Sequence, residues 1–244
     1  MEDTWTFYAA FEDRYRGSFD EIKLRVKDYI PFVLGQEGAL KELTALDLGS
    51  GRGEWLSALS DHNIRGVGVD QSPNAVGRAR DLGLEAQVGD IFEFLASAKN
   101  STYRVVTAFH VIEHLPWELQ LRLFTECHRV LAPGGAMIVE WPNTENILVA
   151  TQTFWMDPTH IRPLPVPLAQ FMAEFARFSI VNVKKFRSPS SADKPQAVST
   201  ESFIVRLSSR LLNSIAAKSD ASHESDELRQ LMRAPRDVAL ICTK

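Results

Sequence analysis

The sequence predicts an α/β protein built on a doubly wound, mostly parallel sheet of seven strands. From about residue 43 to residue 143, short apolar runs alternate with helical patterns, which is typical of parallel strands and their crossover helices. Two strand-like segments near the end of the chain, Ser179–Phe186 and Asp237–Thr243, predict a closing hairpin. With 45% hydrophobic residues in 244, the chain can bury a core without disulfides. We therefore expect one domain over residues 1–244.

The first 40 residues are expected to form an N-terminal helical cap. Ser18 and Glu21 have the spacing of a capping box, which predicts a helix start. Apolar residues then recur at helical spacing, namely Ile22, Val26, Tyr29 and Ile30. Pro31 is expected to end this amphipathic helix, because a proline inside a helix removes a hydrogen bond.

Residues 41–187 are expected to form the core of alternating strands and helices. The predicted strands are Thr44–Leu48, Arg65–Asp70, Leu84–Val88, Tyr103–Phe109 and Ala136–Trp141. The predicted helices are Glu54–Asp61, Pro73–Leu82, Ile91–Ala98 and Pro116–Leu131. Pro73 and Pro116 suit first-turn positions, and the segment 133–135, Pro-Gly-Gly, should stop the last helix before the next strand.

The remaining residues are expected to add a loop and a helical insertion, 188–234, before a last strand, 235–244. Ser188–Pro195 is polar and loop-like, and Glu201–Ala217 has a helical pattern. In such a sheet, ligands bind at the carboxyl ends of the strands near the switch point. Functional residues are therefore expected in the loops that follow the predicted strands.

Charge and cysteine content narrow the class of protein. With 27 Lys+Arg against 31 Asp+Glu, the net charge is -4 and the pI is near 5.9, which argues against a DNA-binding surface. Cys127 and Cys242 lie in apolar surroundings and are expected to be buried thiols in a reducing compartment. No apolar run reaches the roughly 18 to 20 residues of a transmembrane helix, and the start of the chain lacks a signal-peptide pattern. A cytoplasmic protein is expected.

A glycine-rich turn follows the first predicted strand. Gly49, Gly51 and Gly53 allow the backbone to approach a ligand closely, and the helix that follows offers free amides. The spacing departs from the dinucleotide fingerprint, because position 54 is Glu, and an acid there would repel a pyrophosphate. A cofactor that has no phosphate and carries a positive centre fits better.

The segment 47–53, Asp-Leu-Gly-Ser-Gly-Arg-Gly, resembles motif I of the class I S-adenosylmethionine (SAM)-dependent methyltransferases. Leu-Ala-Pro-Gly-Gly at 131–135 adds to this resemblance, which implies their Rossmann-like fold and SAM as cofactor. It further implies that Asp70 takes the ribose hydroxyls, that Asp90 lies near the adenine amine and that Arg16 approaches the methionine carboxylate. The implied cofactor-binding residues are Arg16, Asp47, Gly49, Ser50, Gly51, Trp55, Asp70, Gln71, Asp90, Ile91 and Phe109.

The sequence His-Val-Ile-Glu-His begins at His110, directly after the fourth predicted strand. If this segment is helical, His110, Glu113 and His114 share one face and form half of a divalent-metal shell. The string also matches an inverted zinc-peptidase signature, which we reject because a strand precedes it and Pro116 follows. Without a metal, Glu113 and His114 would be only a structural pair beneath the cofactor.

The same segment resembles the Glu-x-x-Glu-His of small-RNA 2′-O-methyltransferases and the Val-Ile-Glu-His of ubiquinone-pathway O-methyltransferases. In the small-RNA enzymes a distant histidine completes a metal site, and His160 corresponds to it here. The metal ligands implied are His110, Glu113, His114 and His160. Because His110 replaces the first glutamate, manganese, iron or zinc is favoured over magnesium.

The segment Phe154–Pro165 is aromatic and then rigid, which suits either a sugar or a flat aromatic acceptor, or simply a cover for the sheet end. Together with residues 7–18, its Asp-Pro-Thr-His at 157–160 resembles methyltransferases associated with bacterial O-antigen and other surface-polysaccharide glycosyltransferases. This resemblance implies O-methylation of a terminal sugar hydroxyl, with glycosyltransferases as partners, in the cytoplasm or peripheral to the inner membrane. The implied catalytic residues are His110, Glu113, His114, Asp157 and His160.

Other functions stay open at this point. If no metal binds, His114 or His160 becomes the general base, with Asp157 as its orienting partner. The alternatives are an RNA 3′-terminal 2′-O-methyltransferase, a small-molecule O-methyltransferase and a non-catalytic SAM-binding partner of a glycosyltransferase. A nicotinamide oxidoreductase is the remaining alternative, which the glycine spacing disfavours.

Overall fold

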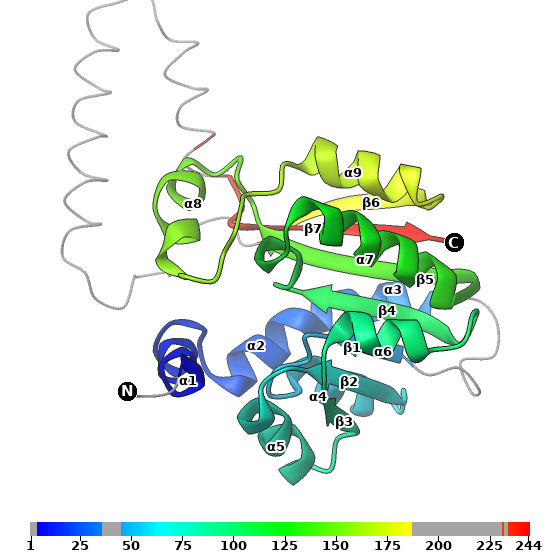
Figure 1. Ribbon diagram of the computed structural model, residues 1–244, viewed down its shortest axis with the longest axis horizontal. Coiled ribbons are helices and arrows are strands. Elements are labelled where there is room, and N and C mark those ends of the chain that lie inside the picture. Colours follow the sequence, from blue (N-terminus) through cyan, green and yellow to red (C-terminus); the bar gives the residue numbers. More distant parts are fainter. Residues whose placement is uncertain (1–3, 36–44, 187–230, 232–233) are drawn as a thin grey trace, which may run out of the picture.

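The computed structural model describes residues 4–35, 45–186, 231 and 234–244, and it has the predicted α/β architecture (Figure 1). Seven strands form one sheet in the order β3-β2-β1-β4-β5-β7-β6, with β7 antiparallel to β5 and β6. The strands are β1 (Ala45–Leu48), β2 (Gly66–Asp70), β3 (Ala86–Val88), β4 (Tyr103–Phe109), β5 (Leu131–Pro142), β6 (Ser179–Phe186) and β7 (Asp237–Thr243). The order reverses at β1 and β4, so a ligand site is expected at their carboxyl ends.

Strand β5 begins earlier than the sequence predicts. Pro133–Gly135 was expected to separate helix from strand, but this segment lies inside β5, and the preceding helix runs directly into it. The backbone N–H of Gly134 donates to Lys244 O, and the N–H of Lys244 donates to Gly135 O. Pairing with the end of the chain therefore extends the strand through residues that break helices.

The described residues also form helices around the sheet. They are α1 (Thr4–Tyr15), α2 (Phe19–Val26), η1 (Lys27–Tyr29), α3 (Ile30–Leu34), α4 (Glu54–Ser60), α5 (Pro73–Asp81), α6 (Ile91–Ser97), η2 (Ile112–His114), α7 (Trp117–Val130), α8 (Ile147–Thr151), η3 (Thr153–Met156) and α9 (Val166–Phe175). Helices α8 and α9 were not predicted, and α1 lies in the expected N-terminal helical cap, although its bounds were not predicted. The expectation that Pro31 ends the first amphipathic helix is wrong, because Pro31 occupies the first turn of α3, where its missing N–H costs nothing. Pro116 precedes α7 as its N-cap rather than lying in its first turn.

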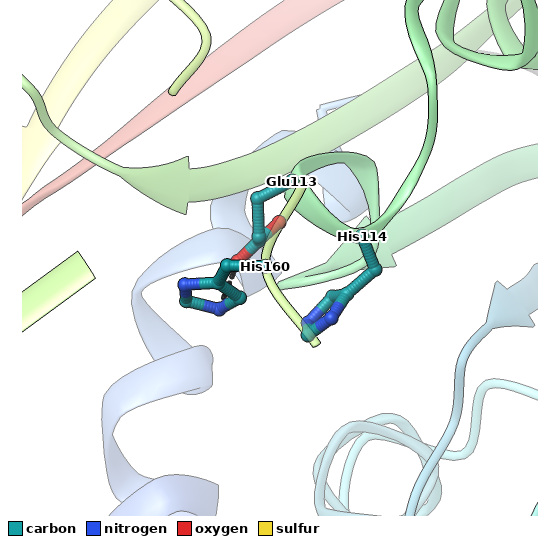
Figure 2. Close-up of side chains that lie close together, drawn as sticks. All are labelled: Glu113, His114 and His160. Carbon is teal, nitrogen blue, oxygen red and sulfur yellow. Dashed lines mark ion pairs between the residues drawn. The ribbon is translucent and has the colours of Figure 1, made fainter. Parts of the chain in front are cut away.

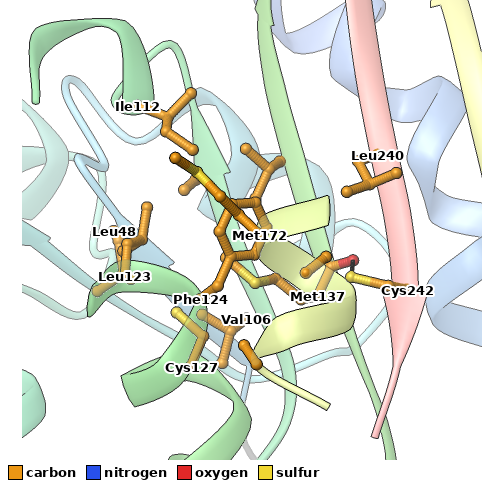
Figure 3. Close-up of a cluster of buried hydrophobic side chains, with 14 of the residues drawn as sticks. Leu48, Val106, Ile112, Leu123, Phe124, Cys127, Met137, Met172, Leu240 and Cys242 are labelled. Carbon is orange, nitrogen blue, oxygen red and sulfur yellow. Dashed lines mark hydrogen bonds between the residues drawn. The ribbon is translucent and has the colours of Figure 1, made fainter. Parts of the chain in front are cut away.

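Side chains that alternate along the strands bury two separate apolar layers. One layer joins the sheet to α6, α7 and α9, and Figure 3 shows part of it, including Leu123 and Phe124 of α7 and Met172 of α9. The opposite face packs on α2, α3 and α4, where the predicted apolar stripe of Ile22, Val26, Tyr29 and Ile30 is buried. Both faces of the sheet are thus covered, as a parallel sheet requires.

The predicted capping box begins α2. Ser18 Oγ accepts from the Glu21 N–H, and the Glu21 carboxylate accepts from the Ser18 N–H at 2.9 Å. The start of α2 is fixed by these bonds, and α2 packs against α4. Among the helices that the structure describes, none is long and apolar enough to cross a membrane.

Some predicted features lie outside the described residues. They are Thr44 at the start of the first strand, the loop Ser188–Pro195 and the helical insertion Glu201–Ala217. The closing hairpin itself is confirmed, because β6 and β7 pair antiparallel from Ser179↔Thr243 to Phe186↔Asp237. Both cysteines are buried free thiols, and burial raises the pKa of each.

Candidate active site

The glycine turn after β1 has a backbone that only glycine adopts readily. Gly49 and Gly51 have φ angles of 70° and 52°, in the left-handed region. A β-carbon on Gly49 would also overlap the side chain of Val111. The turn brings its amides next to β2, where the Gly51 N–H donates to Asp70 Oδ2 at 2.8 Å. The loops after β1 and β2 are thereby joined at the carboxyl edge of the sheet.

Two predicted cofactor acids lie at the ends of neighbouring strands. Asp70 ends β2, and its Oδ1 accepts from the Ser72 N–H at 2.8 Å. Asp90 follows β3 and caps α6 by accepting from the amides of Phe92 and Glu93. The Gln71 amide donates to Asp90 Oδ2 at 3.0 Å, so Gln71 links the two loops. The structure brings these predicted residues together along one edge.

Arg16 reaches the glycine turn from the segment after α1. Its guanidinium nitrogen Nη1 lies 3.0 Å from the position that a β-carbon on Gly51 would occupy. Arg16 also pairs with Glu12 at 2.6 Å. The positive charge of Arg16 therefore lies beside the turn. This position is compatible with the prediction that Arg16 approaches the methionine carboxylate of SAM.

Glu54, the first residue of α4, is not a free charge. Its carboxylate lies 2.7 Å from Arg52 Nη2, and both side chains are nearly fully buried. Arg52 also donates to Gly17 O, which ties the turn to the start of α2. Because Arg52 balances it, the expected repulsion between Glu54 and a pyrophosphate is weaker than the sequence alone indicates.

Three other predicted cofactor residues lie mainly in the core. Trp55 and Phe109 are 2% and 9% exposed, and their rings meet edge to face at 5.4 Å on the side covered by α2. Ile91 is buried in the opposite layer. Among the described residues, Trp55 Nε1 has no hydrogen-bond partner. Trp55 and Phe109 therefore pack in the apolar layer that also contains Tyr29.

Asp47, in strand β1, and Ser50, within the turn, are both buried. Asp47 Oδ1 accepts from the Thr107 hydroxyl at 2.7 Å, and Asp47 is 3% exposed. Burial raises the pKa of Asp47 to about 7, against the lowering effect of the Thr107 hydrogen bond. The carboxyl group of Asp47, next to the turn, therefore becomes ionised near neutral pH.

Replacing Asp47 with Asn should flatten the pH dependence of stability. Because the folded pKa of about 7 exceeds the ordinary value of 3.8, the native state binds this proton more tightly than the unfolded state. The unfolding free energy of the wild type should thus fall as pH rises from about 4 to 7. The total fall is about 1.4 kcal/mol for each pH unit by which the folded pKa exceeds the unfolded pKa. Asn keeps an acceptor for Thr107 and has no charge to bury.

Urea unfolding of the SAM-free protein between pH 4 and pH 8 measures this difference. The stability of Asp47→Asn relative to wild type should rise through that window. Asp81→Asn, at an exposed position, serves as the control and should track wild type. A constant difference between Asp47→Asn and wild type at all pH values would show that Asp47 is ionised throughout.

The partly buried ring of His110 contacts two buried carboxylates. Its Nδ1 is 3.0 Å from Glu113 Oε1, and its Nε2 is 3.0 Å from Glu140 Oε1. Ionised carboxylates only accept, so both ring nitrogens carry protons and His110 is an imidazolium. Burial lowers the His110 pKa, but the bonds to Glu113 and Glu140 outweigh it and the pKa is raised. Tyr29 donates its hydroxyl proton to Glu140, which anchors the network to the helical cap.

The predicted four-ligand metal set is therefore divided. His110, at a φ of 55°, turns toward Glu140 and Asp237, and its ring nitrogens are both engaged. Glu113, His114 and His160 form a second group, with one potential ligand atom from each within 4.8 Å of the others. Figure 2 shows Glu113 and His114, from η2, beside His160, from the segment after η3.

This second group leaves potential ligand atoms without partners. Glu113 is fully buried, and its Oε2 has no hydrogen-bond partner among the described residues. His160 Nδ1 donates to Phe154 O at 2.7 Å, which leaves the lone pair of a neutral ring on Nε2. That Nε2 faces Glu113 Oε1 at 4.0 Å and Asp157 Oδ2 at 3.8 Å. A lone pair facing two carboxylate oxygens is unfavourable without a cation or proton between them.

Asp157 lies next to this group and is held by several donors. Its Oδ1 accepts from the N–H and hydroxyl of Thr159, at 2.9 and 2.6 Å, and its Oδ2 accepts from Tyr8 at 3.1 Å. Burial raises the pKa of Tyr8 well above its ordinary value, so Tyr8 stays a donor. Sequence reasoning missed Tyr8 and Thr159 as site residues. Their only signal was their place within the two segments that resemble O-antigen methyltransferases.

Solved structures of SAM-dependent methyltransferases share this fold. A SAM-dependent methyltransferase from Archaeoglobus fulgidus aligns with a TM-score of 0.77 and 24% identity over 98% of this chain and all of that one. Geranyl diphosphate C-methyltransferase from Streptomyces coelicolor, solved with S-adenosyl-L-homocysteine, aligns with a TM-score of 0.61 and 13% identity, covering 92% of this chain and 81% of that one. These similarities show that the chain has the fold of the class I SAM-dependent methyltransferases.

The sequence comparisons give the family. Residues 19–176 match the family model described as a methyltransferase domain, and the chain belongs to this family. A probable SAM-dependent methyltransferase of Mycolicibacterium smegmatis is 31% identical over 137 residues, or 55% of this chain and 51% of that protein. The chain spans about half the length, or less, of the curated relatives it matches. SAM is accordingly the methyl donor expected at the turn after β1.

Proposed function

We propose that this methyltransferase transfers a methyl group from SAM to a hydroxyl of a terminal sugar in a bacterial surface glycan of the O-antigen type. The observation that carries the proposal is the group Glu113, His114 and His160 beside Asp157, at the carboxyl edge of the sheet. Trp155 is 57% exposed and lies two positions before Asp157 in the sequence. Aromatic surface beside polar groups suits a sugar, which has an apolar face and a rim of hydroxyls.

The transfer needs a proton acceptor, because a sugar hydroxyl is a poor nucleophile at neutral pH. An oxygen lone pair of the acceptor attacks the methyl carbon, the bond from that carbon to sulfur breaks, and S-adenosylhomocysteine leaves. The hydroxyl proton passes to a neutral imidazole of His114 or His160. Burial lowers the pKa of His160, which supports a neutral ring there.

A divalent metal also fits the group. The buried, unpartnered Oε2 of Glu113 and the ring nitrogens of His114 and His160 provide one oxygen and two nitrogen ligands. Such a set favours manganese, iron or zinc over magnesium. When bound, a divalent ion would lower the pKa of a coordinated sugar hydroxyl. His110 is left out of the proposed ligands, since its ring is an imidazolium.

The cofactor assignments follow the same edge of the sheet. Asp70 would accept from the ribose hydroxyls, Asp90 would lie near the adenine amine, and Arg16 would pair with the methionine carboxylate. This order is supported by the contacts that tie Asp70 and Arg16 to Gly51 and Gln71 to Asp90. Glycosyltransferases of the same pathway are the proposed partners, with the enzyme in the cytoplasm or at the inner membrane.

A methyl-transfer screen tests the proposal. Isotopically labelled SAM is incubated with glycans that present reducing or non-reducing sugar termini, with a ribo-oligonucleotide and with a small-molecule phenol, each with and without added Mn²⁺, Zn²⁺ or Mg²⁺. We expect label on a terminal sugar hydroxyl. Label on a ribo-oligonucleotide or on a small-molecule phenol, or SAM binding without turnover on any glycan, would contradict the proposal and identify the alternative function.

A further inference from the structure

The hydroxyl of Thr159 lies between a carboxylate and a histidine of the candidate site. Its Oγ1 is 2.6 Å from Asp157 Oδ1 and 2.8 Å from His114 Nδ1. A threonine hydroxyl has one hydrogen to donate and two lone pairs that accept. The two contacts must therefore differ in direction, and the partner that can only accept receives the hydrogen.

Asp157 is that partner. Its two oxygens already accept from the Thr159 N–H and the Tyr8 hydroxyl, and these donors stabilise the ionised carboxylate. Thr159 consequently donates its hydroxyl hydrogen to Asp157 and accepts from His114. The hydrogen of neutral His114 must then lie on Nδ1, which leaves the lone pair on Nε2.

We infer that Thr159 is a positioning residue. Its hydroxyl forms a hydrogen-bonded relay between the Asp157 carboxylate and His114, and it holds His114 as the Nδ1–H tautomer. The relay follows the logic by which a buried carboxylate orients a catalytic histidine, with one hydroxyl inserted between the two. The part that concerns catalysis rests on the proposed function, because Nε2 is the atom that would take the acceptor's proton or bind a metal. The tautomer itself depends only on the protein.

Helix α1 completes the relay from far along the chain. Tyr8 donates to Asp157 Oδ2, although the two residues are 149 positions apart. The side chain of Asp157 is thus fixed from two sides, by Thr159 on its own loop and by Tyr8 on α1. The tautomer of His114 therefore depends, through Asp157 and Thr159, on the docking of α1.

Nitrogen-15 NMR of the histidine rings tests the inference directly. The full chain is labelled at the imidazole nitrogens, and the spectrum of His114→Gln assigns the His114 signals among the six histidines. In alkaline buffer, wild type and Thr159→Ser should show His114 as Nδ1–H, because serine keeps the hydroxyl. Thr159→Val should give a mixture with the Nε2–H form. Thr125→Val, on the exposed face of α7, serves as the control and should match wild type.

Two results would overturn the relay. One is Nε2–H His114 in the wild type, and the other is an unchanged tautomer in Thr159→Val. Once the glycan screen supplies an acceptor, Thr159→Val should lower kcat by about 10- to 100-fold with little change in KM for SAM, and Thr159→Ser should restore it. The spectra need no acceptor, so failure of the glycan assignment and failure of the relay give different results.

Discussion

Replacing Glu113 with Gln should remove divalent-metal binding while the fold and SAM binding persist. The variant keeps an oxygen that can accept from His110, so the change removes charge rather than shape. We expect Mn²⁺ or Zn²⁺ affinity to fall by more than about 100-fold, above the 10- to 100-fold typical of residues that only orient a ligand. Isothermal titration calorimetry of the SAM-loaded protein with each metal measures this loss.

Matched variants distinguish the loss of a metal ligand from the loss of a negative charge elsewhere on the protein. Glu85→Gln removes an exposed carboxylate that pairs with Arg65, and it should leave metal affinity unchanged. His114→Ala and His160→Ala should each weaken metal binding. If both histidine variants keep the full transfer rate and a chelator has no effect on it, the metal does not take part in the reaction.

Replacing Asp70 with Ala should weaken SAM binding by about 10- to 100-fold. A hydrogen bond to a charged group contributes about 1.5–3 kcal/mol, and about 1.4 kcal/mol corresponds to a factor of ten. The variant also loses the bonds from the Gly51 and Ser72 amides, so the turn is released together with the ribose contact. Titration calorimetry with SAM gives the affinity.

Two controls identify the source of this effect. Asp81→Ala, at an exposed position on α5, should bind SAM as wild type does. Asp70→Asn keeps one acceptor for a backbone amide, and its thermal midpoint reports whether the turn survives. Unchanged SAM affinity in Asp70→Ala would move the ribose away from this carboxylate.

Most of the fold could be predicted because its signals are local. The capping box at Ser18, the glycines after β1 and the acids after β2 and β3 each depend on neighbours within a few positions. The apolar runs that predicted the central strands are buried on both faces of the sheet, and this environment produces such runs. Local pattern and global fold agree at these elements.

The candidate site was predicted only in part, since two of its features depend on non-local contacts. The left-handed backbone of His110 turns its ring away from His114, whereas a helical pattern would have kept the two together. Tyr8 reaches Asp157 through tertiary docking of α1, which the local sequence does not encode. Pairing of Gly134 with Lys244 likewise extended β5 through residues that favour a turn.

Helix α1 lies at the end of the sheet toward which β4 points (Figure 1), and it is held mainly by polar contacts. From Thr6 to Tyr15 none of its described residues is fully buried, while Tyr8 bonds to Asp157 and Asp13 pairs with Arg78. Segments with few buried apolar contacts open at a lower free energy than the core does. Local unfolding of α1 should therefore expose the proposed cofactor and acceptor sites while the sheet stays intact. Amide hydrogen exchange should be faster in α1 than in β4 and should slow when SAM is bound.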